Sequence, residues 1–187
     1  MIEEIKKYWW HNGHFNENQM NFFIELLTTI KPKNILEIGF ASGRSCCTSL
    51  ICAEPLKMIS IDIDLDYMSA RKHAEFMMLN FKNLKIIEGD SKKIICDEFL
   101  LNEFPNGLDF IFIDGGHSYN DAFLDIKNTF NHLNKNGVMI IDDYYSGPPD
   151  GCFIQEVNDA VNDFAKKNNL EISTWNNNGK GFAILKK

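Results

Sequence analysis

The sequence predicts an α/β protein built on a doubly wound, mostly parallel sheet. Strand-like apolar runs alternate with amphipathic helical segments along most of the chain. The first run, Ile35–Ile38, passes through a glycine-containing turn into an apolar helical segment, as at the ligand-binding edge of an open sheet. The chain ends in two strand-like segments around the turn at 176–179, which predicts a hairpin and hence one antiparallel strand.

A helical arm is expected before the sheet. Residues 2–11 read as a short amphipathic helix with an aromatic end, which either packs as part of the arm or covers a ligand site. Residues 17–30 show helical spacing, and Pro32 ends that segment. We therefore divide one domain of 187 residues into an arm, 1–32, and a core, 33–187.

Strands are expected to alternate with helices from the first strand to the final hairpin. The later strands are expected at 57–62, 84–88, 108–113, 138–141, 170–175 and 181–185. The helices are expected at 66–80 and 91–102, after the capping-box pattern Ser118–Asp121, and around Ile154, Val157, Val161 and Phe164.

Composition excludes several classes of function. The net charge of −7 argues against a broad nucleic-acid surface. No apolar run approaches the roughly 20 residues that span a membrane, and the charged N-terminus lacks a signal-peptide core. The five cysteines form no C-x-x-C pair, which favours reduced thiols in a cytoplasmic protein. A homo-oligomer is left open.

The turn after the first strand carries the pattern Glu37-x-Gly39-x-x-x-Gly43. Ala41 stands where a dinucleotide fingerprint needs its middle glycine, which disfavours an NAD-dependent dehydrogenase. The pattern resembles motif I of the class I S-adenosylmethionine (SAM)-dependent methyltransferases. Ser45, at the start of the next helix, is either a donor to the SAM carboxylate or an ordinary first-turn serine. The alternative for the whole stretch is a packing loop of another α/β protein.

Polar residues at the next two strand ends suit a nucleoside. Asp62 can accept hydrogen bonds from both hydroxyls of a ribose, and Asp64 is a weaker competitor for this role. Asp90 and Ser91 follow the third strand, where methyltransferases reach the adenine. The alternative for either residue is a helix N-cap.

Three carboxylates follow the fourth and fifth strands: Asp114, Asp142 and Asp143. Unpaired, they would repel one another, and a divalent cation such as Mg²⁺ removes that cost. The alternative is that Asp142 and Asp143 are turn residues and Asp114 contacts the cofactor amine. His117 lies near the site mouth, where an imidazole can take a proton from a hydroxyl.

The residues Asp114 to Tyr119, followed by Asp125 and by Asp142-Asp143, sharpen the resemblance. They resemble small class I methyltransferases with a D-G-x-H-x-Y motif, a group that includes cephalosporin-hydroxylase-like and macrolide-sugar O-methyltransferase relatives. The same layout is similar to the catechol-type, metal-dependent O-methyltransferases. The resemblance implies Mg²⁺ on Asp114, Asp142 and Asp143 and a base at His117. It also implies a seven-stranded sheet of order 3-2-1-4-5-7-6 with strand 7 antiparallel. Asp143 replaces a common asparagine and His117 a lysine, so metal use stays open.

These observations predict a SAM-dependent methyltransferase that transfers a methyl group to a hydroxyl of a small molecule or sugar, with catalytic roles for His117 and Asp114. An amino-group methyltransferase is disfavoured, because Asp114-Gly-Gly-His stands where [DN]-P-P-[YFW] is expected. Acceptor specificity is expected from the arm, residues 115–119 and the loop 144–152. The alternative is a non-catalytic or hydroxylase-associated protein of the same fold.

Overall fold

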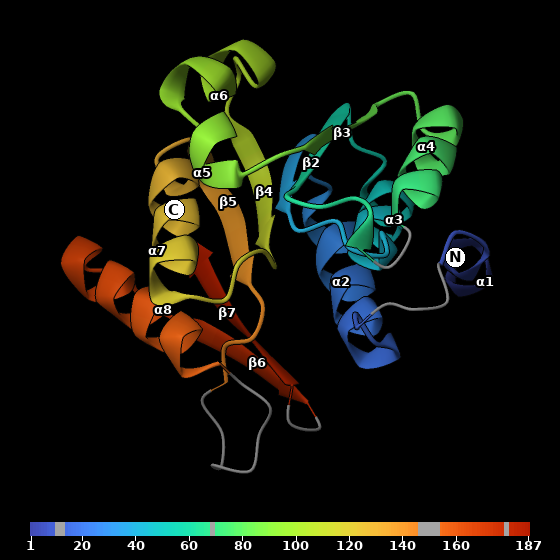
Figure 1. The fold of residues 1–187 in the computed structure, drawn as a ribbon. Coiled ribbons are helices and arrows are strands. Elements are labelled where there is room, and N and C mark those ends of the chain that lie inside the picture. Colours follow the sequence, from blue (N-terminus) through green and yellow to red (C-terminus); the bar gives the residue numbers. More distant parts are fainter. Residues whose placement is uncertain (10–13, 68–69, 146–153, 178–179) are drawn as a thin grey trace. The chain divides into compact units, whose positions relative to one another are not determined.

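A computed structural model describes residues 1–9, 14–67, 70–145, 154–177 and 180–187. The chain forms two compact units, Met1–Asp90 and Ser91–Lys187 (Figure 1). The single domain expected over the whole chain stays a prediction. Most of the expected acceptor loop, the tip of the final hairpin and the end of the aromatic cluster lie outside the described residues.

The first unit contains a parallel sheet. In it β1 (Asn34–Ile38) pairs with β2 (Lys57–Asp62), which pairs with β3 (Leu84–Glu88). Its helices are α1 (Ile2–Lys7), α2 (Glu17–Ile30), α3 (Arg44–Ala53) and α4 (Ala70–Asn80). Helix α2 starts with a capping box in which Asn16 accepts the N–H of Gln19 and Gln19 accepts the N–H of Asn16. Helix α1 ends at Lys7, before the expected boundary at residue 11.

The second unit contains a mixed sheet. In it β4 (Leu108–Ile113) runs parallel to β5 (Leu133–Ile141), and β7 (Lys180–Lys186) lies antiparallel between β5 and β6 (Ser173–Asn177). Its helices are α5 (Ser91–Ile94), α6 (Asp97–Glu103), α7 (Tyr119–Phe130) and α8 (Gln155–Asn168), and α7 packs beside α8 (Figure 1).

Three expected boundaries in the second unit shift. The helix expected at 91–102 is two helices, because Cys96 adopts extended angles between them. Strand β5 begins at Leu133 and not at 138. Its pairing with β4 is irregular between Leu108 and Phe110, and this irregularity accommodates the turn at Asn136 within the strand. Strand β6 lies later than 170–175, because pairing of Ser173 with Ile184 of β7 sets its register.

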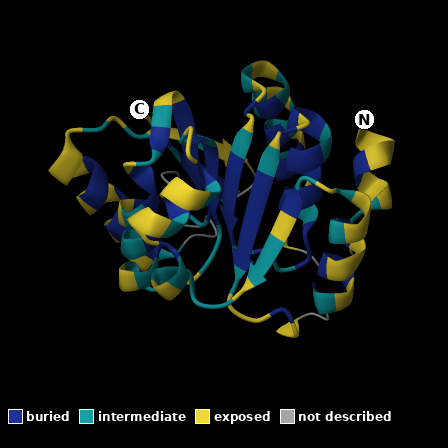
Figure 2. Ribbon diagram, turned by 90° about the horizontal axis from the view of Figure 1, so that it is seen from above, coloured by how far each residue is buried: buried dark blue, intermediate teal, exposed yellow. Residues whose placement is uncertain are grey.

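The strand order agrees with the expectation. It is β3-β2-β1 in the first unit and β4-β5-β7-β6 in the second, which together read as 3-2-1-4-5-7-6 with β7 antiparallel. Strands β1, β4 and β5 are buried along most of their length (Figure 2), as strands covered on both faces should be. Among the described residues, no helix combines the length and the hydrophobicity needed to cross a bilayer.

Candidate functional site

The loop between β1 and α3 has the backbone of a close-approach turn. Gly39, Ala41 and Gly43 all have positive φ angles, of 96°, 42° and 69°. Gly43 is the N-cap of α3, and a Cβ there would lie 2.6 Å from Cζ of Phe40. Both the left-handed angle and the packing therefore require glycine at position 43.

Asp62, at the end of β2, holds this loop. Its Oδ2 accepts hydrogen bonds from the N–H groups of Phe40 and Ala41, each at 2.8 Å, and its Oδ1 accepts one from the N–H of Asp64 at 2.9 Å. A carboxylate has about four acceptor positions, and the described residues use three of those of Asp62, which leaves one for a ligand hydroxyl. The expected ribose contact of Asp62 stays a prediction, and the sequence did not indicate its bonds to the loop.

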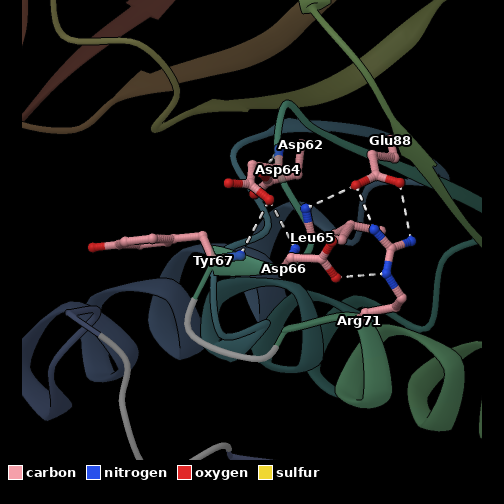
Figure 3. Close-up of polar contacts among 7 residues, drawn as sticks. All are labelled: Asp62, Asp64, Leu65, Asp66, Tyr67, Arg71 and Glu88. Carbon is pink, nitrogen blue, oxygen red and sulfur yellow. Dashed lines mark hydrogen bonds and ion pairs between the residues drawn. The ribbon is translucent and has the colours of Figure 1, made fainter.

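The competitor Asp64 is committed to local structure. Its Oδ1 accepts hydrogen bonds from the N–H groups of Asp66 and Tyr67, at 2.9 and 3.2 Å (Figure 3). Arg71 reaches Asp66 at 2.8 Å and both oxygens of Glu88, at 2.6 and 3.0 Å. The exposed carboxylates of Asp64, Asp66 and Glu88 approach one another within 4.8 Å, and Arg71 supplies a cation beside two of them.

Glu37 is buried beneath the loop, with 1% of its surface exposed. Its Oε1 accepts a hydrogen bond from Oγ of Ser45 at 2.6 Å, and its Oε2 accepts one from Oγ of Ser60 at 2.5 Å. Burial raises the pKa of Glu37 to about 7, although both hydroxyl hydrogen bonds lower it. The hydroxyl of Ser45 thus contacts Glu37 in this structure, and the expected contacts of both residues with SAM stay predictions.

The residues after β3 divide between the two units. Asp90 ends the first unit and is half-buried. Ser91 opens α5 in the second unit, where its Oγ donates a hydrogen bond to Oδ1 of the buried Asp125 at 2.7 Å. This bond links α5 to α7. The expected contacts of Asp90 and Ser91 with adenine stay predictions.

The ends of β4 and β5 bring three of the expected side chains together. Ligand atoms of Asp114, His117 and Asp143 lie within 4.8 Å of one another. His117 Nε2 lies 3.0 Å from Oδ2 of Asp143. The hydrogen bond and charge of Asp143, with a smaller contribution from the charge of Asp142, raise the pKa of His117 against the opposing effect of desolvation.

Asp142 is held by hydrogen bonds with backbone groups at the ends of β5 and β4. It is 8% exposed, and its Oδ1 accepts the N–H of Asp143 at 2.8 Å. The N–H of Asp142 donates to the carbonyl of Ile113, joining the ends of β5 and β4. The expected metal trio contained Asp142, whereas the close group of ligand atoms contains Asp114, His117 and Asp143. The metal role of Asp142 stays a prediction.

The expected capping residues support the His117 loop. Ser118 Oγ accepts the N–H of Asp121 at 3.2 Å and donates to Oδ2 of Asp121 at 2.7 Å. Lys92 pairs with Asp121 at 2.5 Å. The motif residue Tyr119 adds two bonds to α8 that the sequence did not indicate: its N–H donates to Glu156 and its hydroxyl to Asp163.

A cavity of about 560 Å³ in the second unit lies elsewhere. Its lining includes Gly107, His132 and Lys187, near the starts of β4 and β5. Asp114 and Asp143 follow the opposite ends of the same strands. In parallel α/β sheets ligands bind outside the carboxyl ends of the strands, so this cavity is not the candidate site.

Comparison with known proteins agrees with this arrangement. Residues 36–144, from β1 to just beyond Asp143, match the family described as a methyltransferase domain. The chain belongs to this methyltransferase family. The match contains the Glu37 loop, Asp62 and the Asp114, His117 and Asp143 group.

Similar structures show the same fold at low sequence identity. The O-methyltransferase TomG of Streptomyces achromogenes, in complex with SAM, is 16% identical, with a TM-score of 0.75 over 98% of this chain and 89% of that one. An O-methyltransferase from Bacillus cereus in complex with SAH is 19% identical, with a TM-score of 0.72 over 100% of this chain and 90% of that one.

A curated sequence match is shorter. Uncharacterized protein R132 of Acanthamoeba polyphaga mimivirus is 40% identical over 45 residues, which are 24% of this chain and 20% of that protein. The matched segment therefore spans about a fifth of that relative.

Proposed function

We propose that this member of the methyltransferase family is a SAM-dependent O-methyltransferase that acts on a hydroxyl of a small molecule, such as a sugar. The pairing of His117 with Asp143, 3.0 Å apart, beside Asp114, carries the proposal. It gives the methyltransferase domain a base suited to removing a hydroxyl proton. TomG and the Bacillus cereus protein, both named as O-methyltransferases, support the same reaction.

SAM, when bound, supplies a methyl group made electrophilic by its sulfonium centre. The chain's own residues then have to bind SAM and the acceptor, orient them, and deprotonate the acceptor hydroxyl. The loop ordered by Asp62 offers backbone close to the ligand, and the N–H groups at the start of α3 suit the SAM carboxylate. In the proposed reaction Nε2–H of His117 donates to Asp143, the acceptor hydroxyl loses its proton to the other ring nitrogen, Nδ1, and Asp143 stabilises the imidazolium that forms.

A divalent cation such as Mg²⁺ fits the second unit. Asp114 and Asp143 supply carboxylate oxygens, and Mg²⁺ typically uses one or two carboxylates together with water and substrate oxygens. Asp142, which directly follows β5, would supply a further carboxylate oxygen. The cation would lower the pKa of a bound substrate hydroxyl and orient it.

Calorimetric titration of SAM into the purified chain, with Mg²⁺ and again with EDTA, tests the cofactor. Micromolar binding is expected, followed by SAH production when hydroxylated small molecules are added. No SAM binding in either buffer would favour a non-catalytic protein of this fold. Formation of SAH that His117→Ala leaves unchanged would remove His117 as the base.

The cation is tested separately by titrating Mg²⁺ and Mn²⁺. Asp114→Ala and Asp142→Ala should each abolish the binding heat, and retained binding would contradict this site. Asp64→Ala is the matched control, since it alters the exposed acidic group of the first unit instead.

A cytoplasmic location is part of the same proposal and accords with the free thiols of Cys46, Cys47, Cys52 and Cys96.

A further inference from the structure

The carboxyl group of Glu37 joins three elements of the first unit. Glu37 lies on β1, and its two oxygens accept hydroxyl hydrogen bonds from Ser45 in the first turn of α3 and from Ser60 on β2. All three side chains are buried, with 1%, 5% and 0% of their surfaces exposed. Glu37 therefore reaches the start of α3 through Ser45.

The hydrogen of Ser45 determines what this residue can offer a ligand. A serine hydroxyl has one hydrogen and two acceptor positions. While that hydrogen is bonded to Oε1 of Glu37, Ser45 can only accept from a ligand. The SAM carboxylate, expected at the start of α3, is also an acceptor. One hydroxyl hydrogen cannot satisfy two carboxylates, so a second proton is needed.

We propose that Glu37 is a positioning residue that acts on SAM through Ser45. When SAM binds, Glu37 takes up one proton from solvent and donates it to Oγ of Ser45, and the hydrogen of Ser45 turns to the SAM carboxylate. The step adds one proton from solvent to the complex and forms one O–H bond on Glu37. It breaks no covalent bond of the protein or of SAM. It rests on the proposed binding of SAM and adds a proton linkage to it.

The surroundings of Glu37 make this uptake easy at neutral pH. Burial raises the pKa of Glu37 to about 7, and the negative charge of Asp62 on β2 adds to the effect. Among the described residues, the other titratable groups that interact with Glu37 are the thiols of Cys46 and Cys47 on α3. Burial raises the pKa of both thiols, which stay neutral. Within the first unit, the described groups that act on Glu37 thus include no cation that would hold it ionised.

The test is calorimetric titration of SAM at pH 7 in buffers of different ionisation enthalpy. At a pH equal to its pKa, a group is half protonated, so the wild type should take up about half a proton more than Glu37→Gln does. The glutamine amide can donate to Ser45 as the protonated acid does, so this variant should bind SAM without the proton uptake at position 37. The SAM amino group contributes equally to both proteins.

Two further variants sharpen the test. Ser45→Ala should remove the extra uptake, because no hydroxyl then connects Glu37 to SAM, and it also serves as the comparator if Glu37→Gln does not fold. Ser60→Ala should keep the uptake and move it to higher pH, because it removes a bond that favours ionised Glu37.

The outcomes separate this proposal from the function itself. Equal uptake by wild type, Glu37→Gln and Ser45→Ala, or net release of a proton at Glu37, would overturn the linkage while leaving SAM binding intact. Absence of any SAM heat with the folded wild type would overturn both.

Discussion

Nε2 of His117 lies 3.0 Å from Oδ2 of Asp143, although the two residues follow different strands of the sheet. Asp143 adopts a left-handed conformation with φ of 57°, and its N–H donates to Oδ1 of Asp142. Asp143 is thereby held by its neighbour while its carboxylate meets the imidazole. This pair gives the second unit its candidate base.

Asp143→Asn should lower the pKa of His117, because the hydrogen bond and the charge that raise it are weakened. NMR titration of the imidazole signals measures the change. Asp97→Asn is the matched control: Asp97 lies 2.8 Å from His132 in the same unit, and its loss should not affect His117. An unchanged pKa of His117 in Asp143→Asn would contradict the pairing.

Asp62→Ala should weaken SAM binding at least about tenfold, in line with loss of a charged hydrogen bond of roughly 1.5–3 kcal/mol. The structure adds a second reason, because Asp62 also holds the N–H groups of Phe40 and Ala41 in the loop. Calorimetry with SAM gives the affinity. Asp64→Ala should change it less than about threefold, since Asp64 bonds only to local backbone groups in the described contacts. An equal loss of SAM affinity in both variants would contradict the assignment of Asp62 as the residue that binds the ribose.

Gly43→Ala should destabilise the fold by about 2–4 kcal/mol, combining left-handed strain with overpacking. The added Cβ would lie 2.6 Å from the ring of Phe40. Urea unfolding measures the loss. In a Phe40→Leu background, the part of the stability loss that comes from the clash with the ring should shrink, while the part that comes from the left-handed backbone remains. A Gly43→Ala variant as stable as wild type would show that the loop relaxes freely.

Glu37→Gln should stabilise the protein increasingly as pH rises from about 4.5 to 7. The pKa of Glu37 is raised from 4.5 to about 7 on folding, so in this window the folded chain binds a proton that the unfolded chain has lost. The free energy of unfolding of the wild type therefore falls across this window, by on the order of 3 kcal/mol, and the loss is constant above it.

Urea unfolding of wild type and Glu37→Gln at pH 5 and pH 8 checks this difference. Glu75→Gln, which makes the same substitution at an exposed position of α4, is measured beside it as the control. A difference between wild type and Glu37→Gln that is the same at both pH values would mean that Glu37 is ionised throughout.

Several site residues could be placed from the sequence because their positions follow from strand ends. Asp62 ends β2, and Asp114 and Asp142 directly follow β4 and β5, as the apolar runs indicated. Their partners could not be read in the same way. Arg71 beside Glu88, and Tyr119 beside Asp163, join residues from different elements, and no local pattern specifies such a pair.

The sequence by itself determined the alternation of strands and helices, the glycine turn and the terminal hairpin, because hydrophobic period and turn residues act over a few neighbouring positions. Only the tertiary structure decided that Ser45 bonds Glu37, that Asp62 holds the loop, and that His117 meets Asp143. Those contacts depend on the register between distant segments and on the left-handed backbone of single residues, which are settled when the elements pack.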